Sequence, residues 1–417
     1  MNSNIIDIKK REKIEDHLTD VLRDGARKML AQAVEAEIEC FIDAHVALKS
    51  EKGVPQIVRN GYLPERTIQT GIGGLAVKVP RTRDRGGSNI KFTSTLLPPY
   101  LKRTKSVEEL LPWLYLKGIS TNDFPEALQG LFGKNSSGLS SGVICRLKKK
   151  WEDDLKEFRS RDLSKKRYAY WYADGVYFKA RMSEKQCMLV IIGVEETGKK
   201  ELVALKSGLR ESELSWTDLM LDLKERGLKS PPKLGIGDGA LGFWKALHKT
   251  FNGEVKQQRC WFHKAGNIMN KLPKHLHPTA NKGLQQIWLS ETKEHAEKSF
   301  ERFLKTYEDK YPKATKCLLK DKKELLTFYD FPASHFQHIR TTNAIESVFA
   351  TVKLRTAKTR GCLSQETGEY MAYKLIQSAS DKWIRLRGGK HTAEVIEGIN
   401  FKNGIQTLEN KIVRNAV

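Results

Sequence analysis

The hydrophobic pattern changes near residue 167, and this change constrains the fold more than any other feature of the chain. The segment RYAYWYADGVYFKARM (167–182) is rich in aromatic residues, and QCMLVIIGVEETGKKELVALKSG (186–208) contains two further apolar runs around a Thr-Gly turn. Aromatic and β-branched residues between turn signals are typical of strands. We therefore expect three strands in succession.

Helices and strands alternate in the next part of the chain. SELSWTDLMLDLKERG (212–227) has helical spacing, whereas PKLGIGDGALGFWKALH (232–248) and EVKQQRCWFHKAGNIMNKL (254–272) each begin as a strand and continue as a helix. Three strands that pair in sequence and are followed by alternating elements predict an α/β fold, with a mixed sheet and helices on its faces.

Three regions follow from these patterns. Residues 1–105 should form a helical region with a basic β-arm, 106–160 a helix-turn-helix-like DNA-binding domain, and 161–417 the sheet domain. Within the last region, residues from about 264 to 335 show helical spacing without strand signals, so we expect an all-helical insertion there.

The N-terminal region combines a helix with the basic arm. The helix is expected over 8–50, and ERTIQTGIGGLAVKVPRTRDRGG (65–87) predicts two strands around a Gly-rich turn. Alternate residues Arg81, Arg83 and Arg85 would share one side of an extended chain, either to bind phosphates or as an ordinary solvated loop. The expected apolar face of the helix consists of Leu18, Val21, Leu22, Met29, Leu30, Ala33 and Val34.

Residues 106–157 are compatible with a helix-turn-helix unit, and equally with an ordinary three-helix bundle. Its last helix would carry Lys148, Lys149 and Lys150 near the edge of an apolar face, where Lys side chains can bind DNA phosphates. The chain has 73 Lys and Arg residues against 50 Asp and Glu, a net charge of +23. Such an excess favours a nucleic-acid partner.

Other features point to the cytoplasm, with association to the nucleoid. The longest apolar run, MLVIIGV (188–194), is too short to cross a membrane, and the first residues resemble no secretory signal. The six cysteines are scattered singly, which indicates a reducing compartment rather than a disulfide framework.

Three acidic residues are candidates for chemistry. Asp174 lies inside an apolar strand, Asp238 follows a strand end, and Glu346 borders the apolar stripe of a helix made by Ile345, Val348, Phe349 and Val352. The alternatives are a helix N-cap for Asp238 and a capping box of Asn343 with Glu346. Three convergent carboxylates can hold two divalent ions that activate one oxygen of a phosphodiester reaction and stabilise another.

Several motifs resemble bacterial insertion-sequence transposases of the Mutator-related family. They are YADGVYFKAR, GIGDGALGFWKAL, CWFHK, IRTTNAIES and the basic segment RTAKTRG, in this order. The resemblance implies an RNase H-like fold in which Asp174, Asp238 and Glu346 form a DDE triad. It also implies an all-helical insertion in the chain before Glu346. This sequence departs from many members of the family in the residues GDGALG around Asp238. Nearby cations Lys353, Arg355 and Arg360 would then bind DNA.

The resemblance also includes Cys260 and His263. Zinc binding is one interpretation, because His275 and His277 follow, but this spacing does not match the usual structural zinc sites. We therefore favour a role for Cys260 and His263 in supporting the catalytic site, and expect the same of Asn343. Trp288 either packs in the helical insertion or stacks on an unpaired base.

The sequence thus predicts a DNA transposase. It would bind the terminal inverted repeats of its element as a homodimer or larger homo-oligomer, and would cleave and join double-stranded DNA with two Mg²⁺ or Mn²⁺ ions per site. The alternatives are an RNase H-like nuclease or resolvase, and a non-catalytic DNA-binding repressor.

Overall fold

The structure is a computed structural model that describes residues 17–116, 141–179, 185–208, 210–239, 241–358 and 364–407, with 119, 126, 127 and 129 between them. The chain divides into unit 1, residues 1–146, and unit 2, residues 147–417. The division falls inside helix α4 (Ser141–Ser160), so the predicted helix-turn-helix is split. Its first predicted helix is described as α2 (Lys105–Leu116), whereas most of the second, expected over 120–133, lies outside the described residues.

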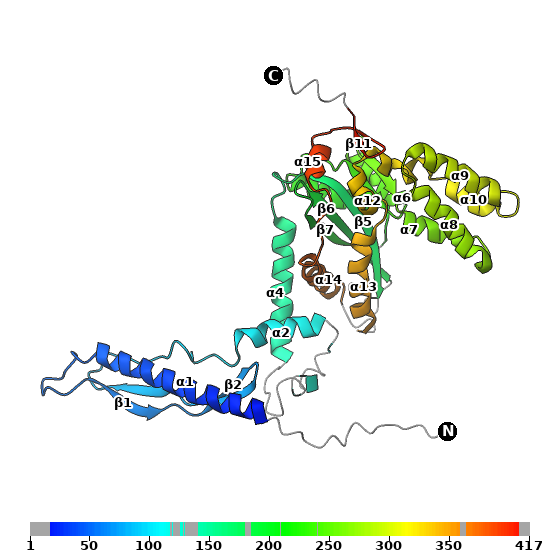
Figure 1. Cartoon of the computed structure of the whole chain (residues 1–417). Helices are drawn as coiled ribbons and strands as arrows, with labels where there is room; N and C mark the ends of the chain where they lie inside the picture. The colour runs from blue at the N-terminus through cyan, green and yellow to red at the C-terminus, as the bar shows by residue number, and fades with distance from the viewer. Residues whose placement is uncertain are drawn as a thin grey trace, which may run out of the picture. The chain divides into compact units, whose positions relative to one another are not determined.

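Unit 1 contains a long helix and short strands (Figure 1). Strands β1 and β4 pair antiparallel, and so do β2 and β3, which confirms the two strands expected around the Gly-rich turn. The elements of unit 1 are α1 (His17–Ala44), β1 (Ile57–Tyr62), β2 (Arg66–Thr70), β3 (Gly73–Val77), β4 (Pro80–Asp84) and α2 (Lys105–Leu116).

The predicted apolar face of α1 is wrong for its first half. Val34 and Ile38 are buried, and Leu30 packs with Val34 against the strands. By contrast Leu18 and Met29 are 69% and 66% exposed, and Val21 and Leu22 are also exposed. The strands pack against the side of α1 that carries Leu30 and Val34. The apolar residues near the start of the helix lie outside this contact and are exposed.

Unit 2 is built on a five-stranded mixed sheet with the strand order β7-β6-β5-β8-β9. The first three strands pair antiparallel in sequence, whereas β8 is parallel to β5 and β9 is parallel to β8. This confirms the predicted mixed α/β arrangement. The strands are β5 (Tyr168–Lys179), β6 (Lys185–Glu195), β7 (Lys200–Gly208), β8 (Leu234–Gly237) and β9 (Lys256–Arg259).

Helices cover this sheet and extend beside it. The helices that follow the strands are α5 (Glu213–Glu225), α6 (Leu241–Thr250) and α7 (Trp261–Met269). The later helices are α8 (His277–Trp288), α9 (Lys293–Tyr307), α10 (Pro312–Leu319), α11 (Lys322–Leu325), α12 (Phe336–Ile339), α13 (Asn343–Lys358), α14 (Gln365–Ser380) and α15 (Lys390–Ile396). Short 3₁₀ helices η2 (Lys274–Leu276), η3 (Thr327–Asp330) and η4 (Ala333–His335) and a small hairpin, β10 (Phe401–Lys402) with β11 (Ile405–Gln406), complete the unit.

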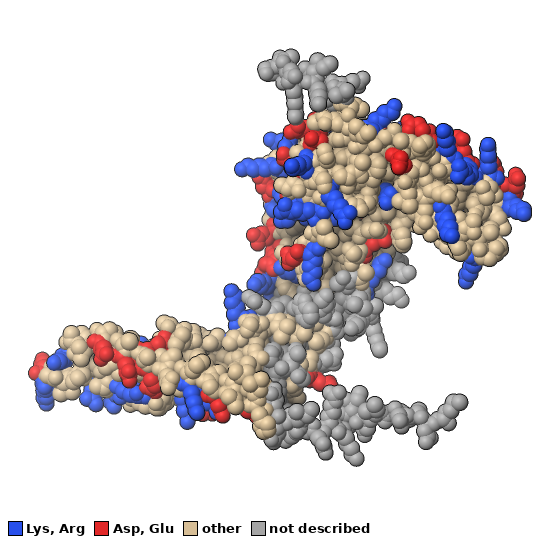
Figure 2. Space-filling model, in the orientation of Figure 1, with Lys and Arg blue, Asp and Glu red and all other residues tan. Residues whose placement is uncertain are grey.

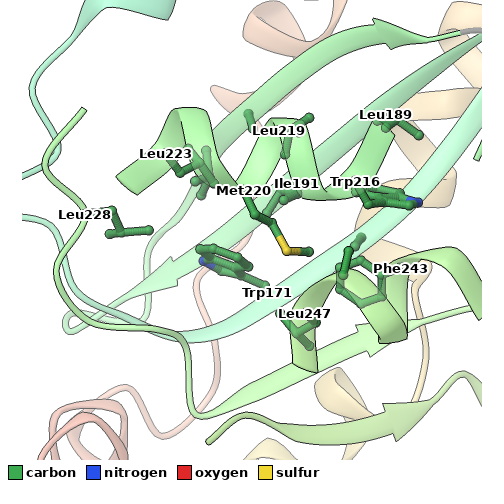
Figure 3. Close-up of a cluster of buried hydrophobic side chains, with 14 of the residues drawn as sticks. Trp171, Leu189, Ile191, Trp216, Leu219, Met220, Leu223, Leu228, Phe243 and Leu247 are labelled. Atoms are coloured by element: carbon green, nitrogen blue, oxygen red, sulfur yellow. The ribbon is translucent and has the colours of Figure 1, made fainter. Parts of the chain in front are cut away.

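The two faces of the sheet differ because side chains alternate along a strand. On β5, Trp171 and Ala173 point into an apolar core that α5 and α6 close with Trp216 and Phe243 (Figure 3). After a register shift between Tyr168 and Tyr170, the even positions point to the other face, where the Tyr170 hydroxyl lies 2.6 Å from His335 Nδ1. Asp174 belongs to this second, polar face by the same alternation.

The segment between β9 and α13 is helical throughout. Residues 261–339 are all described, and they contain no strand. Figure 1 shows α8, α9 and α10 as a block beside the sheet. Phe300, Phe303 and Tyr307 are buried and Leu304 is half-buried, as the helical spacing predicts. No described helix has the length and apolar character needed to cross a membrane.

Candidate active site

Asp174 and Asp238 lie at the same level on neighbouring strands. The parallel register pairs Tyr172 of β5 with Ile236 of β8. Each aspartate lies two residues further along its strand direction, so both side chains point to the same face of the sheet. Asp238 directly follows Gly237, the last residue of β8, at the carboxyl edge where α/β sheets place their ligand sites.

Glu346 approaches this edge from α13. Ile345, Val348, Phe349 and Val352 are between 0% and 3% exposed, which confirms the predicted apolar stripe. Glu346 lies beside that stripe and is half-buried. Burial, the charge of Asp238 and the charge of Glu346 all raise the pKa of Asp174. Asp174 and Asp238 are thus brought within 4.8 Å of each other, whereas Glu346 lies on α13, which packs against β5, and belongs to a second group of ligand atoms.

A fourth acid, Glu211, is part of the same cluster and was not predicted. Carboxylate oxygens of Asp174, Glu211 and Asp238, here called the acidic group, all lie within 4.8 Å of one another. Burial first, and then the charges of Asp238 and Asp174, raise the pKa of Glu211 to about 7. No sequence signal marked Glu211, because it is an acid in an ordinary loop between a strand and a helix.

Glu346 has a different set of neighbours. Cys260, His263 and Glu346, here called the thiol–imidazole group, also offer ligand atoms within 4.8 Å of one another. His263 Nδ1 lies 3.8 Å from Glu346 Oε1. Thr342 Oγ1 lies 2.8 Å from Glu346 Oε1 and 3.2 Å from Cys260 Sγ, so its single proton serves one of these acceptors at a time.

Strand order explains why Cys260 and His263 are here. Gly237 pairs with Arg259, so Cys260 follows β9 as Asp238 follows β8, and its N–H donates to the Gly237 carbonyl at 2.8 Å. His263 lies in the first turn of α7. Neither His275 nor His277 belongs to the thiol–imidazole group.

Charges inside the thiol–imidazole group reinforce one another. Burial alone would raise the pKa of the Cys260 thiol, but hydrogen bonds from His263 and Thr342 bring it below its ordinary value. The hydrogen bond to Cys260, and then the charges of Cys260, Glu346 and Asp174, raise the pKa of His263 against the effect of burial. Each group therefore lowers the cost of the charged form of the other.

The capping-box alternative for Glu346 does not match these contacts. It requires Asn343 as the residue before the helix, but α13 begins at Asn343, which is exposed. Thr342 precedes the helix instead, and its carbonyl accepts from the Glu346 N–H at 3.2 Å. Glu346 directs its carboxylate to the Thr342 hydroxyl, a neighbour that the sequence pattern did not reveal.

Trp288 packs against another aromatic residue. Its ring centroid lies 5.1 Å from that of the buried Trp261, and its carbonyl accepts from Arg340 at 2.6 Å. Trp288 itself is half-buried. These contacts favour the packing interpretation over stacking on a base.

The predicted DNA-binding residues fall into separate places. Arg81, Arg83 and Arg85 are exposed on and beside β4. Figure 2 shows Lys and Arg side chains along the edge of unit 1 that carries β1, the partner of β4. On α4, Lys149 lies 3.4 Å from Glu152. Lys148 is half-buried and Lys150 is exposed. Lys353 on α13 is exposed as well. The side chains of Arg355 and Arg360 are outside the described residues.

Sequence comparisons relate the chain to known transposases. It is 46% identical over 299 residues to the transposase for insertion sequence element IS6120 of Mycolicibacterium smegmatis, a match that covers 72% of this chain and 92% of the relative. It is 44% identical over 287 residues to the transposase for insertion sequence element IST2 of Acidithiobacillus ferrooxidans, covering 67% and 95%.

A structural comparison found the catalytic core domain of HTLV-2 integrase in complex with magnesium. It is 19% identical, covers 30% of this chain and 88% of that domain, and has a TM-score of 0.18, which is too low to carry an argument. The model of the family "Transposase, Mutator family" matches residues 2–386, nearly the whole chain. The chain therefore belongs to the Mutator family of transposases.

Proposed function

We propose that this chain is a DNA transposase that cuts and joins DNA at the ends of its insertion sequence, with Asp174, Asp238 and Glu346 as its catalytic triad. One observation carries the proposal. In a chain of this family, Asp174 and Asp238 share one level of the sheet with carboxylate oxygens within 4.8 Å of each other, and α13, which carries Glu346, packs against the strand of Asp174. The RNase H-like assignment of the sheet is part of the same proposal.

The donor atoms at this edge of the sheet suit Mg²⁺ or Mn²⁺. Asp174 and Asp238 offer carboxylate oxygens, the ligands that these hard cations prefer. The two aspartates and Glu346 would hold the ions. Divalent cations bound there would activate the attacking oxygen and neutralise the charge of the phosphodiester.

Residues around Glu346 would orient its carboxylate. Thr342 and His263 contact the same oxygen, Oε1, from two directions. This leaves Oε2 for a ligand, since among the described residues the hydrogen bond and ion pair of Glu346 both use Oε1. The imidazolium of His263 also reduces the repulsion between Glu346 and an approaching phosphate.

The direct test is cleavage of duplex DNA that carries the two flanks of the gene, where inverted repeats should mark the element ends. The wild-type protein should nick labelled ends in Mg²⁺, whereas Asp174→Asn and Asp238→Asn should bind the same DNA without cutting it. A protein that binds the ends but never cuts them, even with both aspartates intact, would instead be a repressor.

Recognition of the ends is assigned to unit 1. The exposed arginines of the basic strand, Arg81, Arg83 and Arg85, lie at alternate positions and suit contacts with successive phosphates. Each phosphate contact that is lost should lower the slope of log affinity against log salt by about 0.9.

A triple Arg→Ala variant at these positions tests the assignment in the full-length chain. Its affinity for element ends should fall and its salt slope should decrease by up to about 3. The matched control removes three exposed cations of α9, Lys298, Arg302 and Lys305, and should bind nearly as the wild type does. Equal losses in both variants would mean that only overall charge matters.

A further inference from the structure

We propose that Glu211 is a further ligand of the divalent cation held between Asp174 and Asp238, a role that rests on the function proposed above. The site would then contain four carboxylates instead of three. Glu211 completes the acidic group on the side of the two aspartates, and Glu346 remains beside the thiol–imidazole group.

The position of Glu211 is fixed by the elements on either side. It follows β7 and directly precedes Ser212, the N-cap of α5, whose hydroxyl accepts from the Ser215 N–H at 3.1 Å. The Glu211 N–H itself donates to the Tyr177 hydroxyl on β5 at 3.4 Å. The backbone at this residue is therefore held to both the helix start and the central strand.

Gly175 provides the space for the Glu211 side chain. By the alternation of β5, position 175 faces the apolar side of the sheet, opposite to Asp174. A Cβ atom at this position would lie 2.1 Å from Glu211 Oε1, which is closer than any real contact. Glu211 therefore occupies the space that a side chain at residue 175 would take, and reaches Asp174 through it.

The Glu211 carboxylate has little compensation within the described structure, where the charge of His263 lowers its pKa less than burial and the two aspartates raise it. Among the described residues it forms no ion pair, and its side chain has one weak hydrogen-bond contact, with Cys187 Sγ at 4.0 Å. Glu346 by comparison has Thr342 and His263 as neighbours. Three carboxylates within 4.8 Å repel one another in water-poor surroundings, and a divalent cation between them reverses that repulsion.

Glu213 offers a matched control two residues away. It is an acid at the first position of α5, and its carboxylate lies 3.9 Å from Lys245. It does not belong to the acidic group. Removal of its charge changes the net charge as much as removal of the Glu211 charge does, without changing the donor atoms at the sheet edge.

The test is a titration of the full-length protein with Mn²⁺ alone, with free Mn²⁺ followed by electron paramagnetic resonance. Glu211→Gln should weaken Mn²⁺ binding about tenfold or more, whereas Glu213→Gln should bind as the wild type does. Glu211→Asp keeps the charge and should recover part of the affinity. In cleavage assays, Glu211→Gln should need a higher Mg²⁺ concentration for half-maximal rate.

The outcomes separate this inference from the proposed function. Wild-type Mn²⁺ affinity in a folded Glu211→Gln protein overturns the role of Glu211. If Asp174→Asn loses Mn²⁺ binding in the same experiment, the metal site of the proposed function still stands. Unchanged Mn²⁺ binding in Asp174→Asn would instead remove the metal site on which both depend. If Glu211→Gln does not fold, an Mn²⁺ affinity in Glu211→Asp equal to that of the wild type also overturns the inference.

Discussion

The two faces of the central sheet use the same strand for different purposes. In the middle of β5, the odd-numbered residues Trp171 and Ala173 enter an apolar core, where Trp171 packs among side chains of α5 and α6 (Figure 3). Even-numbered residues carry polar groups, from Tyr170 with its histidine partner to Asp174 with its acidic neighbours. One strand thus anchors the fold on one side and presents chemistry on the other.

The difference teaches that stability and activity should be separable by face. Side chains that close the apolar core contribute mainly through burial, whereas the acids at the sheet edge oppose folding by mutual repulsion. Substitutions on the apolar face should therefore lower the free energy of unfolding and leave the chemistry of the folded molecules intact. Substitutions at the acids should lower the activity and leave the free energy of unfolding near or above the wild-type value.

The largest effect is expected for Glu346→Gln. Loss of this carboxylate should lower DNA cleavage in Mg²⁺ about a thousandfold or more, because several kcal/mol of metal-dependent stabilisation disappear. The free energy of unfolding should stay within about 0.5 kcal/mol of the wild-type value, since glutamine keeps the side-chain volume. Single-turnover cleavage and urea unfolding measure the two quantities, and near-normal cleavage would remove Glu346 from the triad.

Trp216→Ala tests the apolar face. Trp216 is 1% exposed and its ring centroid lies 5.1 Å from that of Phe243. The substitution should lower the free energy of unfolding by about 3–5 kcal/mol, the usual effect of removing a buried Trp side chain. Cleavage per folded molecule should be close to wild type. A variant that is stable but inactive would break the proposed division between the faces.

His335 gives the polar face a pH-dependent contribution to stability. Its Nε2 lies 3.1 Å from the Gly388 carbonyl, which can only accept, so Nε2 carries the proton and Nδ1 accepts from Tyr170. Burial is the main cause that lowers the pKa of His335 from 6.5 to about 4. Charges on His391 and His338 act in the same direction.

Because this pKa is depressed in the folded state, the unfolded chain binds a proton first as pH falls. The contribution of His335 is therefore complete above pH 6.5 and is lost between pH 6.5 and about 4, by about 3 kcal/mol in total. The free energy of unfolding, measured across this range for wild type and His335→Gln, should show a smaller decrease in the variant. Identical pH profiles would contradict the assignment.

The next effect concerns the thiol–imidazole group. Cys260→Ser should lower cleavage about 10–100-fold, as expected for a residue that positions a metal-binding carboxylate, and should leave the protein folded. Protein purified without chelator should contain no stoichiometric zinc. Zinc that is present in the wild type and absent in the variant would show that Cys260 is a zinc ligand and not a positioning residue.

The smallest effect is expected for Tyr172→Phe. The Tyr172 hydroxyl donates to the His338 carbonyl at 3.1 Å, so its removal should lower the free energy of unfolding by about 1 kcal/mol. Cleavage should remain near wild type, because Tyr172 lies two residues before Asp174 and its hydroxyl bonds a backbone carbonyl and none of the described acids. A strong loss of cleavage would extend the catalytic part of the polar face further along β5.

Local pattern predicted much of this arrangement. Aromatic and β-branched runs between turn signals located the strands of unit 2, and a strand-end position predicted that Asp238 would lie near Asp174. Helical spacing correctly buried Ile345 and Val348 and so placed Glu346 at the edge of the core.

Tertiary contacts determine what the sequence could not predict. Glu211 joins the acidic group because Gly175 leaves room for it, and nothing in the loop before α5 encodes that meeting. Thr342 contacts Cys260 only because the end of β9 and the start of α13 lie together in the fold. On α1, apolar residues were expected to be buried, but the short strands cover only the stripe around Val34 and Ile38.

The order of the site residues along the chain has a consequence for synthesis. A nascent chain exposes β5 and β8 outside the ribosome well before α13, because the helices from α7 to α12 are translated in between. A product that ends before α13 lacks Glu346 and Thr342, yet keeps unit 1 with its exposed arginines. If unit 1 binds element ends as proposed, such unfinished chains would occupy those ends without cutting them, and premature termination would itself limit transposition.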